Sequence, residues 1–358
     1  MHNLRMLLPI CLAVTALGAC SKEKKSEPTT VATDSKVTET TTTTTETTTT
    51  TTEPAKPPEP AKPPEPPTNT TDVELTPAMM NLADHKDWKP VPSAPKGAMI
   101  TVLEGAPPFP EGKSFAFLLK LPKNYTLPPH SHLVTERVTV LKGSFNLGHG
   151  DKFDKTKTKE YKPGALFQMP HGHAHFAWTK AETILHIQGV GPWGIFYVNP
   201  KDDPRQPPPE KPASVDRSTD SDLAEATARN VADITWNPGP PSIPAGAEIS
   251  VLEGAAPFPA GKSFVFRLKL PDGYKLPVHS HLVSERVVVI SGTFRFAMGD
   301  AYDDKALKDL KPGATVYMPR GHKHFAGAKG ETVIQVQGVG PWAITYANPD
   351  EDPRNKKK

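Results

Sequence analysis

Short runs in which apolar and polar residues alternate fill most of the chain beyond residue 85. In 263–270 the phenylalanines and leucines take every second position, and Val265, Arg267 and Lys269 stand between them. Successive side chains of a strand point to opposite faces, so this spacing predicts a strand with an apolar inner face and with Arg267 outside. Similar runs predict strands at 114–121, 136–141, 165–169, 183–188, 285–290, 314–318 and 332–337. Glycine and proline separate the runs, and an all-β sandwich or barrel is expected.

An internal repeat with an offset of 149 residues organises this β pattern. His-Ser-His-Leu-Val occurs at 130–134 and again at 279–283, and the alignment runs without a gap from 100–205 to 249–354. A gapless repeat of this length indicates two copies of one folding unit. We expect the two copies to pack against each other within the chain. The predicted boundaries are domain 1 at 72–205, a linker at 206–220 and domain 2 at 221–354.

The composition changes sharply before the first copy. The chain has 42 prolines and only 36% apolar residues, and residues 29–52 contain 16 threonines. Residues 53–67 contain eight prolines. Such a segment cannot bury a hydrophobic core, and its proline part favours extended polyproline II. We therefore expect 21–71 to be a disordered Thr/Pro-rich tether.

The first 20 residues predict export. Arg5 precedes an apolar stretch that is too short to span a bilayer, as in a signal peptide. The stretch ends in Leu-Gly-Ala followed by Cys20, which resembles the lipobox of bacterial lipoproteins; the alternative is an ordinary signal peptide with a chance cysteine. The resemblance implies cleavage before Cys20 and its lipidation. With Ser21 next, it also implies an outer-membrane lipoprotein facing the periplasm or the cell surface, in contact with the membrane through its lipid only.

Charge and cysteine content exclude several classes of protein. The chain has 42 basic and 39 acidic residues, a near-balance that argues against nucleic-acid binding by bulk electrostatics. Its two cysteines, Cys11 and Cys20, both lie at the N-terminus. A disulfide scaffold, a cysteine-ligated zinc site and a cysteine nucleophile are therefore excluded from the two copies.

Histidine and glutamate recur at the same spacing in both copies. Two histidines two residues apart are followed by a glutamate and, after 38 intervening residues, by a third histidine. Residues two apart in a strand point to one face, and burying three imidazoles with a carboxylate is costly unless they are paired or bind a metal. This donor set predicts one divalent transition metal per copy, with Mn, Fe and Zn all possible. The predicted ligands are His130, His132, Glu136, His175, His279, His281, Glu285 and His324.

This pattern resembles the cupin family. The first cupin motif, G-x5-H-x-H-x3–4-E-x6-G, is matched from Gly273 to Gly292, and in the first copy Asn124 replaces the leading glycine. The second motif, G-x5-P-x-G-x2-H-x3-N, is matched in both copies except for its final Asn, where Thr179 and Ala328 stand. The resemblance covers 85–354 and implies a tandem cupin, or bicupin. It also implies a jelly-roll β-barrel with one divalent metal inside for each copy.

Four further polar residues are candidates for the pockets. His173 and His322 lie two residues before the fourth ligand and are interpreted as pocket, second-sphere or rim groups. Gln188 and Gln337 lie on the strand after the second motif, which places them either in the pocket or on the outer face.

Two classes of function remain open from the sequence. The first is a metal-dependent enzyme acting on a small molecule, of the dioxygenase, decarboxylase or isomerase type found among cupins. The second is a non-catalytic module that binds a metal or a small molecule as a sensor or structural unit. The fold does not decide between them, and the sequence has no evident acid–base pair beside the predicted ligands.

Overall fold

The computed structural model describes residues 71, 75–220 and 223–356. The predicted signal peptide, Cys20 and nearly all of the tether lie outside these residues. Within them, regular structure consists of β-strands and six single 3-10 turns, so the predicted all-β class is confirmed. No helix in these ranges has the length and hydrophobicity needed to cross a bilayer.

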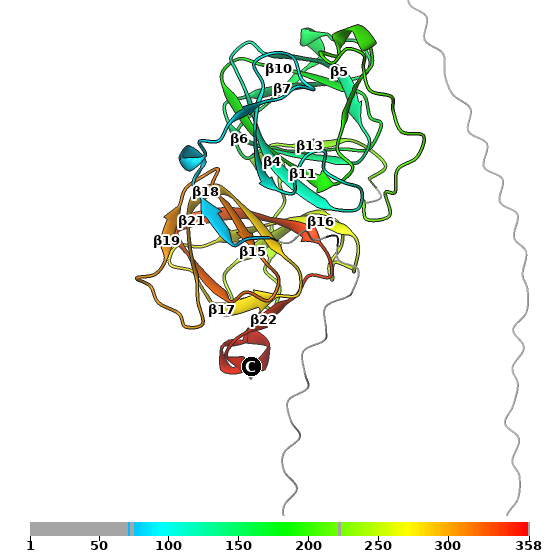
Figure 1. Ribbon diagram of the computed structural model, residues 1–358. Coiled ribbons are helices and arrows are strands. Elements are labelled where there is room, and N and C mark those ends of the chain that lie inside the picture. The colour runs from blue at the N-terminus through cyan, green and yellow to red at the C-terminus, as the bar shows by residue number, and fades with distance from the viewer. Residues whose placement is uncertain (1–70, 72–74, 221–222, 357–358) are drawn as a thin grey trace, which may run out of the picture. The chain divides into compact units, whose positions relative to one another are not determined.

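The strands of the first copy form two antiparallel sheets (Figure 1). The larger sheet has the order β13-β9-β6-β11-β4-β3-β2, and the smaller has the order β12-β5-β10-β7-β8. The strands named in the first copy are β1 (Ala78–Met80), β2 (Lys89–Pro90), β3 (Met99–Glu104), β4 (Ser114–Leu121), β5 (Thr126–His132), β6 (Glu136–Lys142), β7 (Phe145–His149), β8 (Lys159–Tyr161), β9 (Leu166–Met169), β10 (His175–Thr179), β11 (Thr183–Val190) and β12 (Ile195–Tyr197).

The second copy repeats this arrangement with longer strands. Two of them, β18 and β21, run unbroken where the first copy has two strands each, and they join the sheets into one of ten strands. Gly292 lies at a bulge in β18 at φ +77°, and a Cβ there would collide with the backbone carbonyl of Glu331. The strands are β13 (Thr227–Arg229), β14 (Asn237–Pro238), β15 (Glu248–Glu253), β16 (Ser263–Leu270), β17 (Lys275–His281), β18 (Glu285–Met298), β19 (Lys308–Leu310), β20 (Thr315–Met318), β21 (His324–Val339) and β22 (Ile344–Tyr346).

The 3-10 turns are short; four lie in connections between strands, and two follow the last strand, β22. They comprise Leu82–Asp84, Lys155–Lys157, Pro200–Asp202, Val231–Asp233, Pro349–Glu351 and Pro353–Asn355. Their side-chain caps are typical of turns: Asn199 and Asn348, for example, each accept a backbone N–H two residues later. None of these turns contains a buried residue, so they do not contribute to the cores.

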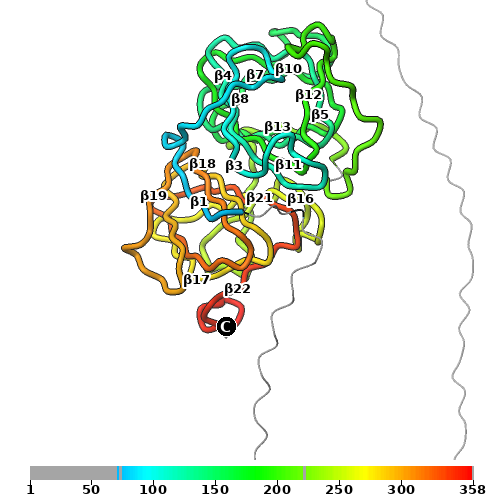
Figure 2. The backbone as a smooth tube through the Cα atoms, in the orientation of Figure 1, coloured from blue at the N-terminus to red at the C-terminus, as the bar shows by residue number. Residues whose placement is uncertain are grey.

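The two copies exchange one strand each. Strand β1, from the segment that leads into the first copy, pairs with β20 of the second copy, with Ala78 opposite Tyr317. Strand β13, from the segment that leads into the second copy, pairs with β9 of the first copy, with Thr227 opposite Gln168. Figure 2 shows the blue trace of β1 among the strands of the second copy. The domain boundaries drawn from the sequence remain predictions. The strand pairing shows that the lead-in segment of each copy joins a sheet of the other copy.

Apolar side chains fill each barrel and also join the two. One cluster fills the first barrel and includes Phe117 and Phe167, and a second fills the other barrel and includes Phe266 and Phe296. Between the barrels, the outer faces of β4, β6 and β11 meet those of β18 and β21. The buried residues of that contact are Leu118, Leu141, Ile184, Val288, Ile290 and Val333.

Arg267 lies on the outer face of β16, as predicted, but it is not exposed to solvent. It has 0% exposure because the first barrel covers it. Its Nη2 donates to Gly164 O of the first barrel at 2.7 Å and to Gln335 Oε1 at 2.9 Å. Burial lowers the pKa of this guanidinium to about 10. The alternation of residues in 263–270 identifies the face correctly but cannot indicate that a second barrel packs on it.

Candidate metal centres

In the first barrel, neighbouring strands bring the predicted ligands together. His130 and His132 end β5 on the same face, and Glu136 begins β6 after a short turn. His175 begins β10, which pairs with β5 so that His175 lies directly opposite His130. All four side chains are less than 10% exposed. The three histidines form a group whose ligand atoms all lie within 4.8 Å of one another.

The carboxylate of Glu136 faces the same point. Its Oε2 lies 3.3 Å from His175 Nε2, and its Oε1 lies 3.6 Å from His132 Nε2. Burial alone would raise the pKa of Glu136, but the adjacent His132 and His175 outweigh this, and the pKa of the carboxyl is lowered. An ionised carboxylate therefore stands beside the three imidazoles.

Backbone carbonyls fix the orientation of each imidazole. The Nδ1 atoms of His130, His132 and His175 lie 2.7, 2.9 and 3.0 Å from the carbonyl oxygens of Pro128, Gly194 and His173, in that order. A carbonyl only accepts, so each Nδ1 carries the proton and donates. Each Nε2 is then left with a lone pair that is available to a metal.

The second barrel repeats this geometry. His279 and His281 end β17, Glu285 begins β18, and His324 begins β21 opposite His279. The Nδ1 atoms of the three histidines lie 2.7, 2.9 and 3.0 Å from backbone carbonyls, as in the first barrel. The Nε2 atoms of His281 and His324, together with Glu285 Oε2, are buried without a hydrogen-bond partner. Buried polar atoms seldom lack partners, so orphaned lone pairs that face one another fit a cation between them.

Burial favours the neutral form, which metals require, in the two histidines of each His-x-His pair. It lowers the pKa of His132 and of His281 to about 4, against partial opposition from Glu136 and Glu285. The pKa values of His130 and His279 also lie well below their ordinary value, for the same reason. Neutral imidazoles with an anionic carboxylate form a donor set for divalent transition metals.

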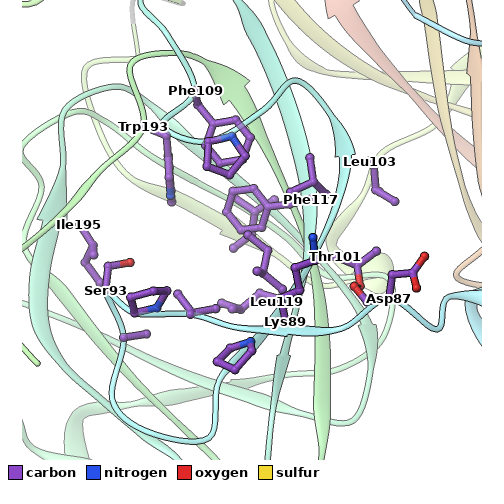
Figure 3. A pocket seen from close by; sticks show the side chains of 18 of the residues that line it. Asp87, Lys89, Ser93, Thr101, Leu103, Phe109, Phe117, Leu119, Trp193 and Ile195 are labelled. Carbon is purple, nitrogen blue, oxygen red and sulfur yellow. The ribbon is translucent and has the colours of Figure 1, made fainter.

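A cavity of about 840 Å³ opens onto the first group of ligands (Figure 3). Trp193 stacks on His132, with ring centroids 4.2 Å apart and planes inclined by 15°. Phe109 and Phe117 stand beside Trp193 in the wall. The cavity continues along the lead-in segment, past Asp87 and Lys89, to Tyr317 of the second barrel. The proposed metal thus lies in a chamber whose adjoining walls are aromatic and aliphatic.

The corresponding chamber of the second barrel is smaller, about 300 Å³. Its wall contains Phe296, which stacks on His324 with a centroid separation of 5.2 Å. The repeat places Leu147 at the matching position of the first barrel. A phenyl ring in place of an isobutyl group narrows the space beside the second set of ligands.

The four additional candidates lie away from both chambers. Gln188 pairs with Arg137 in the register of β11 and β6, so it shares the outer face of the barrel and lines the contact between the barrels. Gln337 occupies the matching place in β21 and accepts a hydrogen bond from Gln335. His173 lies 2.9 Å from His149 at the barrel edge, measured from Nε2 to Nδ1. Neither His173 nor His322 lines a chamber.

Sequence reasoning did not single out three residues that belong to these sites. Trp193 and Trp342 both stack on a proposed ligand, and the only signal for them was the repeated Gly-Pro-Trp sequence. Tyr317 lines the first chamber although it belongs to the second barrel, and nothing in the local pattern of residues indicates this.

Comparisons with known proteins identify the fold. No protein-family model matches the chain, and no curated protein matches its sequence. A putative dioxygenase from Nostoc punctiforme is similar in structure, with TM-score 0.52, 12% identity and coverage of 77% of this chain and 84% of that one.

Two further solved structures are similar. Salicylate 1,2-dioxygenase from Pseudoaminobacter salicylatoxidans, a point mutant in complex with gentisate, has TM-score 0.51, 11% identity and coverage of 79% of this chain and 88% of that one. A cupin 2 conserved barrel domain protein from Leptotrichia buccalis has TM-score 0.47, 13% identity and coverage of 75% and 98%. At such identities the likeness concerns the fold. In its fold, this chain consists of two cupin-type jelly-roll barrels in tandem, and a His-x-His and glutamate motif recurs in each.

Proposed function

We propose that this bicupin binds one divalent transition metal in each barrel and acts as an enzyme on a small molecule. The observation that supports this most is the first barrel, where three imidazole lone pairs and a carboxylate converge, and where His130, His132 and Glu136 line a chamber of about 840 Å³. A structural metal does not need an adjoining chamber, whereas a reaction centre needs room for a substrate beside the metal.

The residues of the first barrel have separate roles in this proposal. The metal would be held by His130, His132, Glu136 and His175. When bound, it would act as a Lewis acid toward an oxygen atom of the substrate. Trp193 covers one face of His132 and excludes water from it. The apolar walls suit a substrate with an apolar body and one oxygen-bearing end. Dioxygenase, decarboxylase and isomerase reactions all fit this donor set.

The metal content tests the first part of this proposal. We expect the purified protein to contain about two transition-metal ions per chain. Changing His130 and His132 together to alanine should remove one ion, because each centre has its own ligands. The matched variant, His279→Ala with His281→Ala, should remove the other. Elemental analysis after metal-replete expression measures this, and a wild-type protein without metal would contradict the proposal.

A non-catalytic binding module is the second candidate, and one observation favours it. Apart from the proposed ligands, the titratable residues that line the first chamber are Arg205, Tyr317 and members of the lead-in segment 84–89. Among the described residues, the chamber wall beside the imidazoles thus contains no further acid or base. Turnover of oxygen-bearing aromatic and aliphatic acids, assayed with the Mn, Fe and Zn forms, separates the candidates. Binding without turnover in all three forms would support the module.

We also propose that the mature chain is anchored to the outer membrane by a lipid on Cys20. The support is the Leu-Gly-Ala-Cys sequence at the end of the apolar N-terminal stretch. Changing Cys20→Ser should block lipidation and move the protein from the membrane fraction to the soluble fraction, as followed by fractionation and gel mobility. A variant that stays in the membrane fraction with unchanged mobility would show that this sequence is not a lipobox.

A further inference from the structure

Two arginines connect the proposed metal centres to the opposite barrels. Arg137 and Arg286 each follow a ligand glutamate in the chain, and they are only 2% and 3% exposed. Arg137 donates through Nε and Nη2 to both carboxylate oxygens of Glu253 in the second barrel, at 2.7 and 2.6 Å. Arg286 makes the same two-point contact with Glu104 in the first barrel. Each arginine is therefore held by a carboxylate from the other copy.

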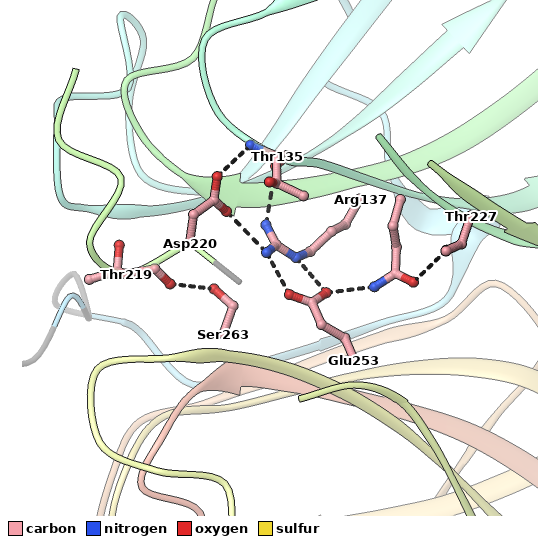
Figure 4. Close-up of polar contacts among 8 residues, drawn as sticks. Thr135, Arg137, Thr219, Asp220, Thr227, Glu253 and Ser263 are labelled. Atoms are coloured by element: carbon pink, nitrogen blue, oxygen red, sulfur yellow. Dashed lines mark hydrogen bonds and ion pairs between the residues drawn. The ribbon is translucent and has the colours of Figure 1, made fainter. Parts of the chain in front are cut away.

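The same charged groups hold the backbone immediately before the first ligand glutamate (Figure 4). Arg137 Nη1 donates to the carbonyl of Thr135 at 3.1 Å, and the N–H of Thr135 donates to Asp220 Oδ2 at 2.7 Å. Asp220 in turn accepts from Arg137 Nη2 at 3.1 Å. Both polar backbone groups of the residue that precedes Glu136 are thus fixed by the cluster.

The second barrel has a matching contact. Arg286 Nη1 donates to the carbonyl of Ser284 at 3.0 Å, one residue before Glu285. Arg286 lies on the outer face of β18, and Glu285 points inward because successive side chains of a strand alternate. A displacement of Arg286 therefore also moves the carboxylate of Glu285, which lies on the other face of the same strand.

From these contacts we propose that each barrel positions the metal-binding carboxylate of the other. Glu253 of the second barrel positions Glu136 through Arg137, and Glu104 of the first barrel positions Glu285 through Arg286. Both glutamates act as positioning residues, since they reach the centres only through an arginine. The inference rests on the metal centres proposed above. Its physical basis is that a metal site binds well only when its ligands are held to about 0.5 Å.

The test measures zinc affinity at one centre at a time. His279→Ala with His281→Ala leaves only the first centre, and His130→Ala with His132→Ala leaves only the second. Glu253→Gln and Glu104→Gln, which keep the side-chain shape and remove the charge, are introduced into each background. Zinc dissociation constants are measured by competition with a chromophoric chelator at fixed pH. Glu182→Gln is the matched control. Glu182 pairs with Lys142, which lies at the exposed end of β6, the strand that begins with Glu136.

A crossed pattern is expected. Glu253→Gln should weaken zinc binding at the first centre by about 10-fold to 100-fold, the range for groups that orient metal ligands, and should leave the second centre within about twofold. Glu104→Gln should do the reverse, and Glu182→Gln should change neither. A merely structural role for these carboxylates would loosen both centres together.

Three results would overturn the inference. They are an equal loss at both centres, a loss confined to the barrel that carries the substitution, and unchanged affinity at both. If the wild-type protein binds no zinc, manganese or iron at all, the proposed function fails together with this inference. If the wild-type protein binds metal but the variants do not show the crossed pattern, only this inference fails. Should Glu253→Gln lose its cooperative thermal unfolding, Asp220→Asn provides the second test. It removes a charge from the same cluster, and its expected effect is a loss at the first centre alone.

Discussion

Removing the metals should lower the free energy of unfolding by about 4 kcal/mol for each centre that is saturated at a thousandfold excess of free metal over Kd. The reason is linkage: the native ligand groups bind the ion, and the unfolded chain hardly binds it. Without a metal, the lone pairs of His281 and His324 and one oxygen of Glu285 are buried with no hydrogen-bond partner. Thermal or denaturant unfolding with and without a chelator at neutral pH measures the difference.

The double alanine variants provide the control for this measurement. A protein that has lost His130 and His132 should respond to chelator with about half of the wild-type change, because one centre remains. If the unfolding curves with and without chelator coincide after loss of metal is verified, the eight predicted ligands do not form metal sites that stabilise the fold.

Changing Arg286→Met should destabilise the protein by about 3–5 kcal/mol, because one charge of a buried pair is removed and the other stays. The side chain of Glu104 has 0% exposure and accepts two hydrogen bonds from Arg286. Methionine fills a similar volume but cannot donate to that carboxylate. The free energy of unfolding, measured in guanidinium chloride, reports the loss.

Two further variants separate this cost from a general effect of losing an ion pair. Replacing both partners, with Arg286→Met and Glu104→Gln together, should recover part of the lost stability because no buried charge is then left alone. Lys142→Ala removes an ion pair whose side chains are about half exposed, and it should cost less than about 1 kcal/mol. A loss for Arg286→Met no larger than for Lys142→Ala would show that the buried pair is not a stabilising contact.

The predictable part of this protein is the part encoded by short-range spacing. The strand at Ser263–Leu270 follows from alternation, and the structure has it with those bounds. His130 and His132 share a face because strands have a period of two, so their joint placement needs no tertiary information. His175 can be assigned to the same site only because the same gap of 38 residues recurs in the second copy. The repeat therefore indicates a contact between residues that are distant in sequence, which a single copy could not indicate.

What could not be predicted is what covers each outer face. Alternation placed Arg267 outside its barrel, but only the packing of the first barrel buries it. The same limit applies to Gln188, for which the pocket and the outer face were equally possible. Its register opposite Arg137 places it at the contact between barrels. Local patterns specify which face of a strand a residue occupies, and the partner of that face depends on the assembled chain.

The exchanged strands have a consequence for how the fold depends on protein concentration. Strands β1 and β13 occupy equivalent positions in the repeat, and so do their partners β20 and β9, so the exchange is reciprocal. Two separate molecules, each containing one copy, would complete their sheets only as a dimer with swapped arms, and dilution would take that dimer apart. In the tandem chain the linker keeps the second copy at an effective concentration in the millimolar range. Completion of both barrels is then intramolecular, and it does not depend on meeting a second molecule.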